Sequence, residues 1–293
     1  MKWRGREQSD NVEDRRGMSP QMALGGGGGI IAVVVVLIMK FMGAPEGVQQ
    51  MAGQMAQKAA QNKSAPAETG DGIQDDHREF ISVVLKDTEN IWTKLFREDI
   101  KGSPAYTRPK LIIFGGQTQT ACGTGQAAMG PFYCPADKQI YIDPSFFDDL
   151  ARRHSAPGDF AQAYVIAHEV AHHIQNLLRF NVPVNQARQS GDERLSNQMS
   201  VRLELQADYL AGVWAHHAHR EYGVLEEGDM QEAIQAANQI GDDTLQQQAG
   251  RAVNPDHFTH GRSDQRVKWF KKGLLSGDLA GAEELFQISY DRL

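Results

Sequence analysis

The residues of this chain best suited to chemistry lie in the run Ala167–His173, which reads AHEVAHH. His168 and His172 are four positions apart, and Glu169 directly follows the first of them. On a helix, positions i and i+4 share one face, so two imidazoles can bind a single zinc ion while the glutamate reaches a water on that metal. This arrangement is typical of a metal-dependent hydrolase, most often a peptidase.

An amphipathic helix is predicted to position these groups. His168 and His172 lie just off one edge of its apolar stripe, and Glu169 lies further toward the polar side. Ligands at this border between core and solvent suit a metal that faces a cleft. The stripe recurs at steps of three and four, at Phe160, Tyr164, Ala167, Ala171, Ile174 and Leu178.

A catalytic zinc usually takes three protein ligands and leaves one position for water. One well-known solution places a third histidine six residues after the second, with a glycine between, but Leu178 and Gln175 stand at those positions. The segment RLELQADYLAG, from Arg202, offers another solution on a second predicted helix. Glu204 is the predicted third ligand.

Asp208 stands one helical turn after Glu204 and can accept the free ring N–H of a ligating histidine, which fixes the orientation of that ring. The alternative is an ordinary solvated helix face. The apolar neighbours of Glu204, at Leu203, Leu205 and Ala207, disfavour that alternative.

These motifs resemble the bacterial neutral zinc metallopeptidase family, whose zinc ligands are two histidines and a glutamate, as in gluzincins. The resemblance rests on HEVAHH followed by ELQAD, the paired cysteines before the first of these helices, THGRSDQR near the end, and the opening MKWRGREQSDNVEDRRG. It implies one zinc ion per chain, held by His168, His172 and Glu204, with Glu169 as the catalytic base. It does not supply a substrate.

A peptidase of this kind also needs a donor for the oxyanion that develops on the scissile carbonyl. His260 is the candidate donor, and Arg266 is expected to brace the ligands or to bind a substrate carbonyl. Two alternatives remain open. His260 can instead cap the helix that begins near Ser263, and the hydroxyl donor can come from Tyr133, Tyr141 or Tyr209.

Composition narrows the class of protein and its compartment. The 293 residues carry a net charge of −7, which argues against nucleic acid as a partner. The two cysteines, Cys122 and Cys134, close a glycine-rich loop and are predicted to form a disulfide in an oxidising compartment. Two unlinked thiols are the alternative.

Met22–Met42 is predicted to be a transmembrane helix, because a helix of this length covers about 30 Å, the thickness of a hydrocarbon core. A cleavable signal peptide or a buried core helix are the alternatives. Basic residues precede the span at Lys2, Arg4, Arg6, Arg15 and Arg16, whereas after Lys40 none follows until Lys58. This asymmetry predicts a single pass through the bacterial inner membrane, with a cytoplasmic N-terminus and a periplasmic or otherwise extracytoplasmic catalytic domain.

The expected organisation is therefore a cytoplasmic tail (residues 1–21), the transmembrane helix (22–42), a flexible linker (43–74) and a zinc-peptidase domain (75–293). The domain is expected to be α+β and mainly helical, a minimal gluzincin-like fold with a small sheet. Residues 132–142 are expected to wall the cleft, where an extended substrate can add a strand. Strands are predicted at 110–115 and 139–143, and helices outside the zinc site at 80–96, 230–240, 265–275 and 279–286.

Two functions are compatible with this sequence. The first is a membrane-anchored zinc endopeptidase that acts on peptides or proteins. The second is a zinc-containing module on a peptidase fold that binds peptides or a partner protein with little or no turnover. The presence of Glu169 favours the first, because a binding module has no need of a base.

Overall fold

The computed structural model describes residues 1–17, 75–100, 102, 105–153, 158–250 and 252–293. Residues Met1–Asp14 and Asp75–Leu293 form one compact unit. A second unit, Arg15–Gln74, lies almost entirely outside the described residues. The described chain is mainly helical with a small sheet, so the predicted α+β class is confirmed.

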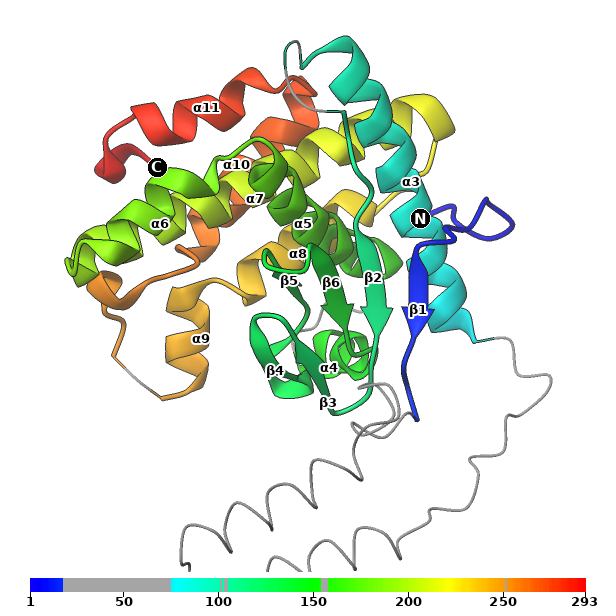
Figure 1. Cartoon of the computed structure of the whole chain (residues 1–293), viewed down its shortest axis with the longest axis horizontal. Coiled ribbons are helices and arrows are strands. Elements are labelled where there is room, and N and C mark those ends of the chain that lie inside the picture. The colour runs from blue at the N-terminus through cyan, green and yellow to red at the C-terminus, as the bar shows by residue number, and fades with distance from the viewer. Residues whose placement is uncertain (18–74, 101, 103–104, 154–157, 251) are drawn as a thin grey trace, which may run out of the picture. The chain divides into compact units, whose positions relative to one another are not determined.

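The sheet has four strands in the order β1-β2-β6-β5 (Figure 1). Strands β1 (Val12–Asp14), β2 (Lys110–Ile113) and β6 (Gln139–Ile142) run parallel, whereas β5 (Phe132–Cys134) runs antiparallel to β6. The predicted strands correspond to β2 and β6, whose continuous apolar runs suit strands covered on both faces. Because β5 stands at one end of the strand order, it is an edge strand.

A two-stranded hairpin formed by β3 (Gln117–Thr120) and β4 (Gly123–Gln126) is attached to this edge. The predicted disulfide is present: Cys122 at the hairpin tip is bonded to Cys134 in β5. The 3₁₀ helix η1 (Ala127–Met129) connects the hairpin to β5. The cross-link therefore ties the hairpin to the edge strand.

The structure differs from the sequence-based expectation at the N-terminus. We expected residues 1–21 to be a tail apart from the catalytic domain, but β1 pairs in parallel with β2. The side chain of Trp3 is buried against Phe80, with ring centroids 5.3 Å apart. Arg6 Nη2 lies 2.6 Å from Asp87 Oδ1. Both partners belong to α3 (Asp76–Glu98), so the N-terminal segment is part of the domain.

Three helices form the core that carries the candidate site: α5 (Asp159–Leu177), α7 (Glu193–Tyr222) and α10 (Ser263–Ser276). The backbones of α7 and α10 touch at two glycines. A Cβ atom on Gly273 would lie 2.0 Å from the Tyr209 carbonyl oxygen, and one on Gly212 would lie 2.2 Å from the Phe270 carbonyl oxygen. Only glycine allows this approach, which brings Arg266 on α10 to α7.

The remaining helices surround this core (Figure 1). Those predicted at 80–96, 230–240, 265–275 and 279–286 correspond to α3, α8 (Asp229–Gln239), α10 and α11 (Ala280–Gln287). The helix after β6 is α4 (Ser145–Arg153). Two helices were not predicted, α6 (Asn181–Gln189) and α9 (Asp242–Gln248). Short 3₁₀ helices are η2 (Pro255–His257) and η3 (Tyr290–Arg292).

The predicted transmembrane helix at residues 22–42 and the linker at 43–74 lie outside the described residues. Within the described ranges, no helix combines the length and the apolar character needed to cross a bilayer.

Candidate metal centre

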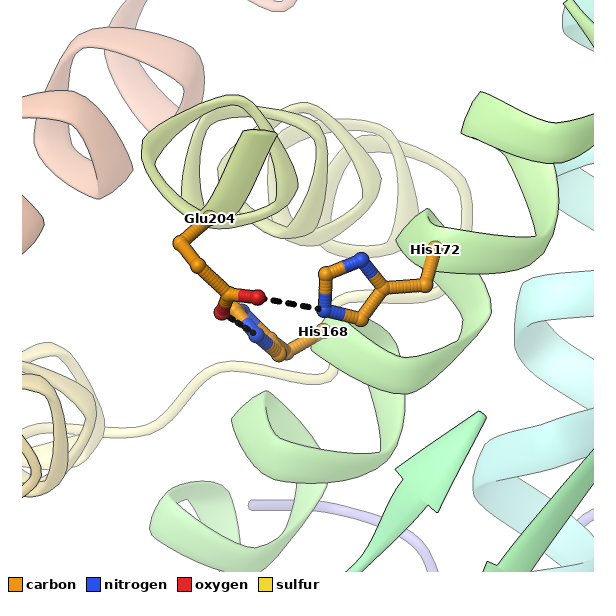
Figure 2. Close-up of side chains that lie close together, drawn as sticks. All are labelled: His168, His172 and Glu204. Carbon is orange, nitrogen blue, oxygen red and sulfur yellow. Dashed lines mark hydrogen bonds and ion pairs between the residues drawn. The ribbon is translucent and has the colours of Figure 1, made fainter. Parts of the chain in front are cut away.

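The side chains of His168, His172 and Glu204 converge between α5 and α7 (Figure 2). His168 Nε2 lies 3.2 Å from Glu204 Oε2, and His172 Nε2 lies 3.5 Å from Glu204 Oε1. The potential ligand atoms of the three residues all lie within 4.8 Å of one another. The structure therefore brings the three predicted metal ligands together.

This triad fits zinc by distance. Tetrahedral coordination with bonds of 2.0–2.2 Å places two ligand atoms about 3.3 Å apart. The two nitrogen–oxygen distances, 3.2 and 3.5 Å, lie on either side of that value. Two neutral imidazoles and one carboxylate also form a ligand set found in catalytic zinc sites.

A buried network holds the first histidine from behind. His168 Nδ1 lies 2.9 Å from Asp208 Oδ1, and Arg266 donates to both oxygens of Asp208, with Nε–Oδ2 at 2.9 Å and Nη2–Oδ1 at 3.0 Å. Tyr164 donates its hydroxyl to Asp208 Oδ1 at 2.5 Å. Asp208 therefore contacts the ring of His168 directly, and Arg266 holds Asp208 in place. Tyr164, which the sequence analysis assigned only to the apolar stripe, is a third member of this network.

The second histidine is held by an amide instead of a carboxylate. His172 Nδ1 lies 2.8 Å from Gln175 Oε1. Gln175 Nε2 donates to the Leu203 carbonyl at 2.6 Å and to Gln206 Oε1 at 3.0 Å. Since the amide oxygen is an acceptor, His172 donates from Nδ1, which leaves Nε2, on the side of Glu204, for a metal ion. The sequence analysis did not predict this role for Gln175. Its position three residues after His172 on the same helix was the signal that could have identified it.

Charges in the metal-free site set the protonation states of its ligands. Burial alone would raise the pKa of Glu204, but the two histidines outweigh it and hold that pKa well below its usual range. Burial lowers the pKa of His168, but Asp208 and Glu204 outweigh it and raise the value to about 10. A metal ion entering the site must therefore displace a proton from His168.

Glu169 lies in the same cleft and has a different environment. Its side chain is 7% exposed and lines a cleft of about 960 Å³. Within the described part of the chain, its carboxylate forms no hydrogen bond or ion pair. A carboxylate beside the metal ligands without a protein partner is available to a water molecule or a substrate.

His260 also lines the cleft, in the loop that precedes α10. Its position is fixed by Asp242, at the start of α9. Asp242 Oδ2 accepts backbone N–H groups from Thr259, His260 and Gly261 at 2.7, 2.6 and 3.0 Å. Asp242 Oδ1 lies 3.2 Å from His260 Nδ1, and this hydrogen bond raises the pKa of the imidazole. Sequence reasoning missed Asp242, because no motif marked it.

The tyrosines that were left as alternative donors are engaged elsewhere. Burial lowers the pKa of His173 to about 4, so its neutral ring donates from Nε2 to the Thr107 carbonyl at 2.6 Å. His173 Nδ1 then accepts the hydroxyl proton of Tyr133 at 3.1 Å. Tyr141 and Tyr209 donate to aspartates and do not line the cleft. His260 therefore remains the candidate donor, and it lines the cleft.

The comparisons with known proteins agree with this site. The chain matches the family described as "Putative neutral zinc metallopeptidase" over residues 1–285, and it belongs to that family. It is 47% identical to the uncharacterized protein YpfJ of Escherichia coli K12 over 284 residues, covering 96% of this chain and 97% of YpfJ. It is 44% identical to the uncharacterized proteins Mb2605 of Mycobacterium bovis and Rv2575 of Mycobacterium tuberculosis over 185 residues, covering 60% of this chain and 61% of each relative. No solved structure matches the chain.

Proposed function

We propose that this protein is a zinc-dependent peptidase with one zinc ion per chain, bound by His168, His172 and Glu204. The observation that carries the proposal is the position of Glu169. It follows a ligand directly in sequence, lines the same cleft, and has no partner in the described part of the chain.

A zinc ion at this site would supply a Lewis acid and a bound water whose pKa is lowered to about 7. Glu169 accepts the proton of the attacking water and passes it to the departing amine. His260 donates to the oxyanion, and Asp242 holds the imidazole in place for this contact. Asp208 and Gln175 orient the two ligand imidazoles through their Nδ1 atoms.

The substrate we propose is an extended segment of a peptide or protein. Strand β5 lies at the sheet edge, and Phe132 and Tyr133 line the cleft. An extended chain can add to such an edge through backbone hydrogen bonds.

The alternative function is a zinc-containing module that binds peptides or proteins without efficient turnover. It would keep the ligands and the cleft but would have no use for Glu169 or for the Asp242–His260 pair. The unpartnered Glu169 and the His260 ring in the cleft therefore favour the enzyme.

The test compares the wild-type chain with Glu169→Gln and His168→Ala. We expect the wild type to cleave casein, with one mole of zinc per chain by atomic absorption and loss of cleavage in a chelator. We expect Glu169→Gln to retain zinc and to lose cleavage by several orders of magnitude, whereas His168→Ala should lose both. Cleavage by Glu169→Gln at the wild-type rate would refute the role of Glu169, and a zinc-loaded wild type without turnover would support the binding module.

For the compartment, we propose that the catalytic domain acts outside the bacterial cytoplasm. The Cys122–Cys134 disulfide supports this, since such bonds persist in oxidising compartments. Attachment to the inner membrane through residues 22–42 and the absence of nucleic acid among the partners stay predictions from the sequence.

A further inference from the structure

Helix α6 presents one polar face to the cleft. The lining residues of this helix are Asn181, Asn185 and Arg188, which are spaced by four and then three positions. This spacing places the three side chains on one face. Val184 and Ala187, on another face, are buried. The short helix therefore packs through its small apolar residues and offers two amides and a guanidinium to a substrate.

Arg188 is held close to the metal ligands by α7. Its Nη2 donates to Ser200 Oγ at 3.3 Å. Ser200 stands one helical turn before Glu204, so their Cβ atoms lie about 6 Å apart. The guanidinium nitrogen is thus within about 11 Å of the Glu204 Cβ atom, which corresponds to at most about three residues of an extended peptide at ~3.3 Å per residue.

No carboxylate of the described residues neutralises the charge of Arg188. Among the described residues its only hydrogen bond is to the Ser200 hydroxyl, and no carboxylate lies within ion-pairing distance. The acidic residues that line the cleft are Glu169 on α5, Glu204 on α7 and Asp149 on α4. Figure 1 shows α6 and α4 well apart, with β5 between them in this view. The end of the cleft next to α6 is therefore positive.

The opposite end differs in character. Its lining residues include Met129 on η1, which contacts α4, and Phe146 and Asp149 on α4 itself. The cleft thus has a cationic end at α6, whereas the lining at α4 and η1 combines apolar side chains with one carboxylate. A peptide that lies along the cleft therefore meets different side chains along its length.

We propose that Arg188, together with Asn185, binds a carboxylate of the substrate two or three residues from the scissile bond. A guanidinium can accommodate a carboxylate through two parallel N–H···O bonds, and a neighbouring amide can add a third donor. The carboxylate belongs either to an acidic side chain or to a free C-terminus. This inference rests on the proposed peptidase function.

The experiment uses internally quenched peptides of one sequence in matched sets. One set carries glutamate or glutamine at each position from three residues before the cleaved bond to three after, always with an amidated C-terminus. A second set has no acidic residue and ends in a carboxylate or an amide at the same distances. For the wild-type chain we expect about tenfold higher kcat/KM with the carboxylate in one of the two sets, and a weaker preference at high salt.

Three variants assign the preference to its residue. In Arg188→Ala the ratio of carboxylate to neutral peptide should fall to about one, and Arg188→Lys should retain part of it because charge remains without the planar fork. Arg194→Ala is the matched control, since Arg194 is an exposed arginine on α7 that does not line the cleft. It should keep the wild-type ratio. An unchanged ratio in Arg188→Ala, or no carboxylate preference at any position of the wild type, would overturn the proposal.

Binding separates this inference from the proposed function. The same peptides are titrated against the zinc-loaded Glu169→Gln chain by fluorescence anisotropy, with and without Arg188→Ala. We expect a Kd about tenfold lower for the carboxylate peptide, and only when Arg188 is present. If the wild type fails to cleave but this difference persists, the peptidase function is refuted and the carboxylate site stands. If cleavage occurs without the difference, the carboxylate site is refuted alone.

Discussion

Asp208 is the point at which one substitution should affect both the fold and the metal site. Its carboxylate is fully buried and receives Arg266, Tyr164 and His168. Asp208→Asn keeps the shape but removes the charge, so the guanidinium of Arg266, 2% exposed, remains buried without a counter-charge. One N–H of the introduced amide must also face a donor of Arg266 or Tyr164.

The magnitude follows from this burial. Breaking a buried ion pair by removing one partner costs about 3–5 kcal/mol. For a domain of this size each kcal/mol corresponds to roughly 2–4 °C, so the melting temperature should fall by about 6–20 °C. Loss of the partner that orients a ligand histidine should also weaken zinc binding by about 10–100-fold.

The assay is urea unfolding of the metal-free protein, followed by competition of the folded variant with a fluorescent zinc chelator. Asp76→Asn is the matched control: it makes the same chemical change at an exposed ion pair, where Asp76 Oδ2 lies 3.1 Å from Arg4 Nη2. It should leave both measurements unchanged. A variant Asp208→Asn with stability within ~1 kcal/mol of the wild type and an equal zinc Kd would refute the role assigned to the network.

Three further predictions concern pH, the cross-link and the helix contact. Since the pKa of His168 is raised to about 10, zinc must displace its proton at neutral pH. The zinc affinity measured by chelator competition should therefore rise about tenfold per pH unit between pH 6 and 8, and a flat profile would contradict this. Reduction of Cys122–Cys134 should lower the free energy of unfolding by about 3 kcal/mol, and the double serine variant should no longer respond to reductant. Gly273→Ala places a methyl group 2.0 Å from the Tyr209 carbonyl oxygen, so it should lower the free energy of unfolding in urea by at least about 1–3 kcal/mol and weaken zinc binding. Wild-type values for both would show that the helices can separate freely.

The ligands were predictable because their geometry is set within single helices. The separation of His168 and His172 is one turn of α5, and Glu204 follows the apolar period of α7. Such local patterns predict which face a residue occupies without any knowledge of how the helices pack. The convergence of the two faces was an assumption, which the distances between the ligand atoms now support.

The groups that hold the ligands were only partly predictable. Asp208 stands one turn after Glu204 and could be anticipated, but Tyr164 reads as a core residue until α5, α7 and α10 are packed and its hydroxyl meets Asp208. Gln175 follows the histidine motif on α5, but its own partners come from α7. Asp242 lies in a segment with no motif, and its partners come from the loop before α10. Contacts between elements distant in sequence leave no periodic signal.

The N-terminal strand was missed for a related reason. Its residues, Val12–Asp14, read VED, which shows no strand period, and they form a strand because β2 offers them an open edge.

The pairing of β1 with β2 constrains membrane topology, because hydrogen-bonded strands cannot lie on opposite sides of a bilayer. The chain leaves the domain after Asp14 and returns at Asp75. Arg4 and Arg6, which were counted as orientation signals, form ion pairs with acidic residues of α3. Consequently, the N-terminal strand and the catalytic cleft must lie on the same side of any membrane.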